Sequence, residues 1–127
     1  ISLDPLVWKL FTLPCSVGIS TGNTVADVLG DDFAGLSYVT QWVVWRRDAQ
    51  NDVYVQMLET DPMFTGQAYW VITSEAGRTV DFEGQFNGSP DSLLAAAPAG
   101  RANLVGNPFD FNVDWSDVQV LDGAQVQ

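Results

Sequence analysis

A chain of 127 residues is long enough to build one domain with a hydrophobic core, and it is too short for two full-sized domains. Its formal net charge of −11, from 16 acidic residues against five basic ones, argues against nucleic acids and anionic membrane surfaces as partners, because both are bound by basic patches. With a single cysteine and no histidine, the chain excludes an internal disulfide and lacks the residue that most often serves as a general base.

The first elements predicted along the chain are a buried strand and a helical turn. Residues 6–13 form a short apolar run that Pro14 ends, a pattern typical of a strand. Thr24 can cap a helical turn over residues 25–30, and Gly30 can close it. No run approaches the roughly 20 apolar residues of a membrane helix, so we expect no membrane insertion.

Two β-hairpins are predicted next. Residues 37–45 and 53–59 are rich in β-branched and aromatic side chains and flank a polar turn. Residues 68–73 and 79–86 flank a second turn, which contains Gly77. These elements predict a mostly-β fold: an antiparallel β-sandwich or a partly open barrel with one or two short helical turns.

The remaining third of the chain predicts a change of organisation. Residues 1–88 form the β-rich unit with its two hairpins, and residues 89–99 predict a short helical connector. Residues 100–127 then form either the start of a second, incomplete repeat or a completing strand of the same domain. The first explanation rests on an internal match, because "WKLFTLPC" from Trp8 can be placed over "ANLVGNPF" from Ala102 with the leucine and proline aligned.

The strand predicted at residues 102–105 needs a partner. An unpaired strand with aromatic neighbours would expose its backbone groups to aggregation. We therefore expect it to pair with the sheet of the first unit or with another chain. Since the chain has neither an initiating Met nor a basic, apolar leader, we also expect it to be part of a longer protein.

Several short motifs occur together in this chain: "GRANLVGNPF" at residues 100–109, "DW" at 114–115, "QWVVW" at 41–45 and "GQAYWV" at 66–71. The set resembles a module found, often in tandem, in large secreted and cell-surface bacterial proteins, with a "GWNLVGNP…GYWV" type of sequence. Ala102 stands where that family usually has Trp. The resemblance implies an extracellular β-rich module of a multidomain protein, with no shared enzymatic activity.

Few residues suggest catalysis. The lone Cys15 lies in an apolar strand with no cation beside it, which leaves no activated nucleophile. Paired carboxylates remain conceivable, and the candidate acids are Asp81, Glu83, Glu59 and Glu75. Solvated acids on outward strand faces are the simpler explanation, so we expect no enzyme and no cofactor and keep a carboxylate-dependent hydrolase fragment as the weakest alternative.

One stretch resembles the beginning of a calcium-binding loop. Its oxygen-bearing side chains are Asp110, Asn112, Asp114 and Asp117. The sixth position is Trp115, where the bend requires glycine, and the twelfth is Leu121, which has no carboxylate. These four residues are therefore weak metal candidates, and we expect no metal.

Aromatic side chains are the better candidates for binding. Along an extended strand, Trp42 and Trp45 point to opposite faces, and Tyr69 and Trp70 do the same. One member of each pair must lie in the core, and the outward members can stack on sugar rings unless a second layer covers them. The candidate ligand-binding residues are Trp42, Trp45, Tyr54 and Tyr69.

Together these observations predict a non-catalytic extracellular module with a structural or adhesive role in a larger secreted or cell-surface protein. The alternative is a carbohydrate-binding module that uses its aromatic side chains as a stacking platform. The expected partners are neighbouring domains of the same polypeptide or another copy of the chain, with a glycan under the alternative.

Overall fold

The computed structural model describes residues 1–16, 22–86 and 101–107, and further along the separate positions 112, 114, 116, 121, 122, 125 and 126. These residues form a mostly-β, antiparallel fold, as predicted. No helix among them has the length and apolar character needed to cross a membrane.

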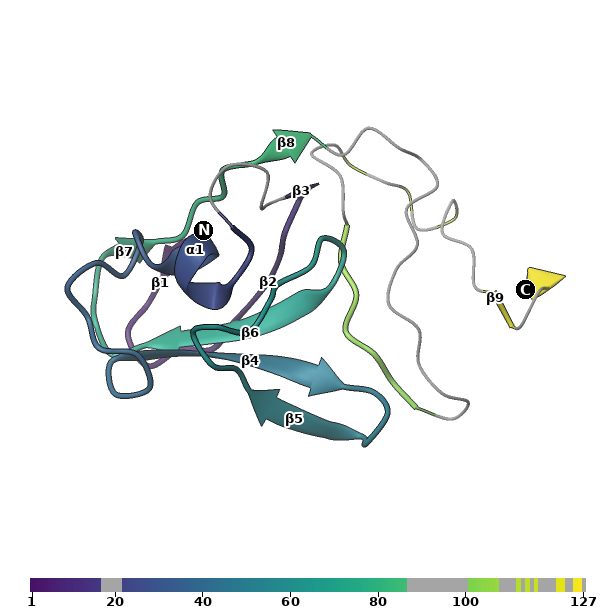
Figure 1. The fold of residues 1–127 in the computed structure, drawn as a ribbon, viewed down its shortest axis with the longest axis horizontal. Coiled ribbons are helices and arrows are strands. Elements are labelled where there is room, and N and C mark those ends of the chain that lie inside the picture. The colour runs from purple at the N-terminus through teal and green to yellow at the C-terminus, as the bar shows by residue number, and fades with distance from the viewer. Residues whose placement is uncertain are drawn as a thin grey trace.

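A four-stranded antiparallel sheet forms the centre of the fold (Figure 1). Its strands, in spatial order, are β2 (Lys9–Thr12), β6 (Ala68–Thr73), β4 (Trp42–Asp48) and β5 (Val53–Gln56). The sheet is open, because β2 and β5 lie at its two ends and do not pair with each other. The predicted strand at residues 6–13 is thus shorter than expected, since only Lys9–Thr12 joins the ladder.

The hairpin of β4 and β5 confirms the first predicted hairpin but turns later than expected. Arg46 and Arg47 lie in the ladder opposite Val55 and Tyr54, so the strand continues to Asp48. The Asp48 carboxylate then accepts hydrogen bonds from the backbone N–H groups of the next turn, the first at 3.0 Å. These bonds fix the turn because an aspartate side chain can replace a backbone acceptor there.

The second predicted hairpin is wrong in its pairing. Strand β6 lies between β2 and β4, so neither of its edges is left for residues 79–86. That part of the chain pairs instead with the N-terminal region. β7 (Arg78–Thr79) pairs with β1 (Ser2–Leu3), and β8 (Gln85–Phe86) pairs with β3 (Cys15–Ser16).

The short helix α1 (Val25–Leu29) confirms the predicted helical turn. Thr24 caps it: the Thr24 hydroxyl accepts from the backbone N–H of Asp27 at 3.2 Å, and the Asp27 carboxylate accepts from the backbone N–H of Thr24 at 3.0 Å. The helix buries Val25 and Leu29 completely. Its role is therefore to add apolar side chains to the core.

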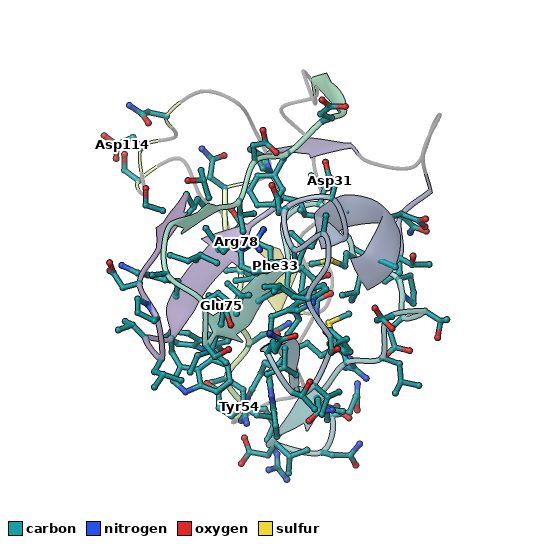
Figure 2. All side chains as sticks on the ribbon, turned by 90° about the vertical axis from the view of Figure 1, so that its left-hand side faces the viewer. Asp31, Phe33, Tyr54, Glu75, Arg78 and Asp114 are labelled. Atoms are coloured by element: carbon teal, nitrogen blue, oxygen red, sulfur yellow. The ribbon has the colours of Figure 1, made fainter. Side chains whose placement is uncertain are left out.

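The core lies between α1, the loops around it and one face of the four-stranded sheet. Trp42 stacks on Phe33 with 4.2 Å between ring centroids, and Phe11 lies 5.7 Å from Tyr69. In Figure 2, Phe33 lies toward the middle of the molecule and Tyr54 near its periphery. The buried side chains that the sheet contributes to this core are Phe11, Trp42, Val44, Tyr69, Val71 and Thr73.

Residues 101–107, which we call the crossing segment, pass across the end of the four-stranded sheet (Figure 1). Val105 forms a β-bridge with Gln67, and the Ala68 N–H donates to the Leu104 carbonyl at 3.2 Å. The Gly106 N–H donates to the Gly66 carbonyl at 2.9 Å. The expected pairing of this part of the chain with the first unit's sheet is therefore confirmed at Leu104 and Val105.

Side chains attach the rest of the crossing segment. The Arg47 Nε donates to the carbonyl of Ala102 at 3.3 Å, and the Thr12 hydroxyl donates to the carbonyl of Asn107 at 3.5 Å. Arg101 forms an ion pair with Asp52 at 2.8 Å. The seven residues of the crossing segment thus contact β2, β6, β4 and the β4–β5 turn one after another.

The division of the chain into units stays a prediction. The connector predicted at residues 89–99 lies outside the described residues. Near the end of the chain, β9 (Leu121–Asp122) and β10 (Gln125–Val126) form a small antiparallel pair.

Candidate functional site

The four-stranded sheet has two faces with different surroundings. Tyr69 and Val71 are buried in the core, whereas Trp70 between them is half-buried on the opposite side. We call this opposite side the outer face. Its side chains come from all four strands: Leu10, Thr12, Val43, Trp45, Arg47, Tyr54, Gln56, Ala68, Trp70 and Ile72, of which Ala68 is buried.

One row of the outer face crosses the whole sheet. Leu10 lies opposite Trp70, Trp70 lies opposite Trp45, and Trp45 lies opposite Gln56. Neighbouring strands are about 4.8 Å apart, so the row spans about 14 Å. Leu10 is 46% exposed and both tryptophans are half-buried, which leaves apolar surface from adjacent strands open to a ligand.

A charged group borders this row on the side of the hairpin turn. Arg47 lies over the ring of Tyr54, with its guanidinium carbon 5.1 Å from the ring centroid. It also forms an ion pair with Asp52, which Arg101 shares. The arginines thus neutralise the acid nearest to the outer face, and the face itself contains no acidic side chain among the residues that the structure describes.

The structure divides the four predicted aromatic residues into two groups. Trp45 and Tyr54 lie on the outer face, and Tyr54 is 48% exposed. Trp42 and Tyr69 are corrections, because both are buried in the core. The Tyr69 hydroxyl accepts from the Phe64 N–H at 2.8 Å, and burial raises the pKa of Tyr69 to about 12. Buried rings cannot form part of a stacking platform.

Leu10 and Trp70 are outer-face residues that the predicted set omitted. The sequence indicated that Tyr69 and Trp70 face opposite ways but not which of them faces the core. Their partners decide: Trp70 lies between Leu10 and Trp45, whereas Tyr69 lies beside buried Phe11. The sequence did not indicate that the Tyr69 hydroxyl could be buried, because its hydrogen-bond partners, Phe64 and Gln67, come from the loop before the strand.

One of the predicted acids, Asp81, lies close to Asp32, which the predicted set omitted. Burial, followed by the charges of Asp81 and Asp31, raises the pKa of Asp32 to about 6. One carboxylate oxygen of Asp32 is buried without a hydrogen-bond partner among the described residues. Figure 2 places Glu75 well away from Asp31, and the Glu75 carboxylate accepts from Gln41 at 3.3 Å.

The other predicted acids do not form a constellation with Asp32. Glu59 and Glu83 are exposed, and the charge of Glu59 contributes to the raised pKa of Tyr38, whose first cause is burial. The Asp32 site can hold a proton near neutral pH. Among the described carboxyl groups, Asp32 is the one whose raised pKa best suits proton transfer near neutral pH.

The weak metal candidates are only partly described. Asn112 and Asp114 are exposed, while Asp110 and Asp117 lie outside the described residues. Asp114 accepts from the backbone N–H and the hydroxyl of Ser116, and these hydrogen bonds lower its pKa. Within the ranges that the structure describes, no group of three acidic, cysteine or histidine side chains is placed to hold a metal ion.

Comparisons with protein-family models, with curated proteins and with solved structures found no match.

Proposed function

We propose that this chain is a non-catalytic extracellular module with a structural or adhesive role in a larger secreted or cell-surface protein, and that the outer face is its contact surface. The observation that carries the proposal is the difference between the two faces of one sheet. The inner face is covered by α1 and its loops, whereas the outer face keeps an apolar row partly exposed. Contiguous apolar surface of this kind is typical of interaction sites.

The sequence motifs support the same role. The strand "GQAYWV" and the segment "GRANLVGNPF" are the parts of the chain that resemble modules of secreted and cell-surface bacterial proteins. Both contribute to the end of the sheet, because Gly66 and Ala68 pair with the crossing segment. The two motifs therefore hold the crossing segment against the sheet, which supports a structural role for them.

A second candidate function is carbohydrate binding. It is favoured by Trp45 and Trp70, which lie on adjacent strands of the outer face, and by Gln56 and Arg47 beside them. Aromatic side chains can stack on the apolar face of a sugar ring, while neighbouring polar side chains bind its hydroxyl groups. The absence of acidic groups from the described outer face suits a neutral polysaccharide.

An adhesion assay tests the proposal. Beads coated with the whole chain are measured for adhesion to each other and to films of cellulose, chitin and α-glucan. We expect Leu10→Ser and Trp45→Ser to reduce adhesion about tenfold or more, which corresponds to about 1.4 kcal/mol, because each removes apolar area from the outer face. Adhesion between beads supports the structural or adhesive role, and adhesion to a film supports the carbohydrate alternative.

The matched control is Phe64→Ser. The exposed fraction of Phe64, 54%, is similar to the 46% of Leu10 and the 48% of Tyr54. Phe64 lies, however, in the loop before β6 and not on the outer face. Circular dichroism establishes that each variant is folded. If Phe64→Ser lowers adhesion as much as Trp45→Ser does, or if the unaltered chain adheres to nothing, the outer face is not the contact surface.

A further inference from the structure

The edge of β5 is unpaired in the described part of the chain. β5 ends the sheet and pairs only with β4. The Met57 N–H donates to the Val44 carbonyl at 2.9 Å, which fixes the phase of hydrogen bonding between the two strands. In an antiparallel pair the bonded positions alternate, so Val55 directs its backbone groups toward β4, whereas Tyr54 and Gln56 direct theirs away from the sheet.

This edge lacks the features that usually protect an edge strand. Natural edges carry charged side chains, especially Lys, or Pro, or bulges that prevent another strand from adding. The opposite edge strand β2 begins with Lys9, and Pro14 follows it. β5 has the sequence VYVQ, without charge, proline or glycine, and Val53 and Tyr54 are exposed.

We propose that two copies of this chain associate through the β5 edge as an antiparallel pair related by a twofold axis at Val55. In this register Tyr54 of each copy lies opposite Gln56 of the other. The free N–H and C=O groups of both residues are then hydrogen-bonded. Val55 of one copy lies opposite Val55 of the other as a non-hydrogen-bonded pair. The two sheets become one, and the two outer faces lie on the same side of it.

Charge opposes a second copy less at this edge than elsewhere on the chain. Each chain carries a net charge of −11, so two copies repel each other over most approaches. The β5 edge has no charged side chain of its own, and Arg47 and Arg101 both pair with the adjacent Asp52. Because its register is self-complementary, a copy satisfies every free group that Tyr54 and Gln56 present.

Cysteine cross-linking tests the register. In a Cys15→Ser background, Val55→Cys places two cysteines at a non-hydrogen-bonded pair, whose Cα atoms are about 4.5 Å apart and within the range for a disulfide. We expect air oxidation to link most of this variant into dimers. The matched control is Val53→Cys, which is more exposed but lies about 14 Å from its equivalent in the proposed register. Equal or greater cross-linking of Val53→Cys would overturn the proposed pairing.

A second pair of variants removes a backbone donor without depending on cysteine. Gln56→Pro deletes an N–H that points away from β4, whereas Gln56→Ala keeps it. Sedimentation of the full chain should show a dimer that strengthens with added salt, because salt screens the repulsion between acidic copies. Gln56→Pro should weaken the dimer at least tenfold, and Gln56→Ala should leave it nearly unchanged. A chain that sediments as a monomer at every concentration and salt level contradicts the proposal.

The dimer and the proposed function can fail separately. Leu10→Ser alters the outer face on β2, three strands away from the β5 edge, and should leave the dimer intact. Conversely, a chain that sediments as a monomer can still adhere to a film through its outer face, so failure of the dimer does not by itself remove the proposed function.

Discussion

Asp32 combines a partly buried carboxyl group with two acidic neighbours. Its pKa of about 6 lies above the unfolded value of about 3.9, so the folded chain holds a proton that the unfolded chain releases between these values. The charged carboxylate therefore destabilises the folded chain above about pH 6. This destabilisation disappears as the pH falls toward 4.

The substitution Asp32→Asn should reveal this contribution. At pH 7 it should raise the free energy of unfolding, because it removes the charge that burial and Asp81 disfavour. Urea unfolding between pH 4 and pH 7 should show the difference from the unaltered chain shrinking toward the acidic end. Glu83→Gln, at an exposed position, is the control. A difference that does not change with pH would show that Asp32 acts by packing and not by charge.

Other acids act in the opposite direction. Hydrogen bonds from Thr24 and Asn51 lower the pKa values of Asp27 and Asp48, respectively. Their contribution to stability is present above about pH 4 and is lost as the pH falls through their folded pKa values. Since Asp27 is exposed and Asp48 is only partly buried, we expect solvent to screen these effects strongly.

Single residues also show what sequence patterns can predict about the site. Alternation along a strand predicted that Trp42 and Trp45 face opposite sides, and this is confirmed. It could not predict which of them is buried, because both are large and apolar. Trp42 is in the core because Phe33 stacks on it, and Phe33 comes from a loop whose position no local pattern predicts.

Among the elements, the crossing segment comes very close to the sheet at Gly106. A Cβ atom at Gly106 would lie 1.7 Å from the Thr12 methyl carbon, so only glycine fits there without displacement. Gly106→Ala should therefore weaken the contacts of the segment. Hydrogen exchange at the Ala68 amide, which donates to Leu104, should become faster.

The second substitution Thr12→Ala removes the closest methyl group and should partly restore the slow exchange. Amides in the β4–β5 ladder, such as that of Val55, serve as the internal control, because they do not contact the segment. Equal acceleration at Ala68 and Val55 would mean that Gly106→Ala destabilises the whole sheet and not the segment alone.

Elements with local signals were predictable, whereas their pairing was not. The helix α1 follows from Thr24 and Asp27, which are three residues apart and cap each other. The β4–β5 hairpin likewise joins strands that are close in sequence. β7 and β8 instead pair with β1 and β3 near the N-terminal end of the chain, and nothing in the alternation of their residues identifies a partner that distant.

At the scale of the whole molecule, the open side of the sheet is also the side without acidic groups in the described part of the chain. The chain has 16 acidic residues, yet the described outer face and the β5 edge contain none. Acidic surface elsewhere keeps molecules apart by repulsion. Contact between modules is therefore least unfavourable at the outer face and the β5 edge, which is where we place both proposed interactions.

The crossing segment has a mechanical consequence for a module that links or adheres. Its contacts are arranged one after another, from Asn107 at β2 to Arg101 at the β4–β5 turn. Tension on the chain beyond Asn107 would load them in succession, as in peeling, and not all at once as in shear. We expect single-molecule pulling to show a low-force step of about 24 Å, the extended length of seven residues, before the sheet ruptures. A single rupture without this step would contradict that expectation. With it, the segment lengthens the tether and absorbs work while β2, β6, β4 and β5 stay folded.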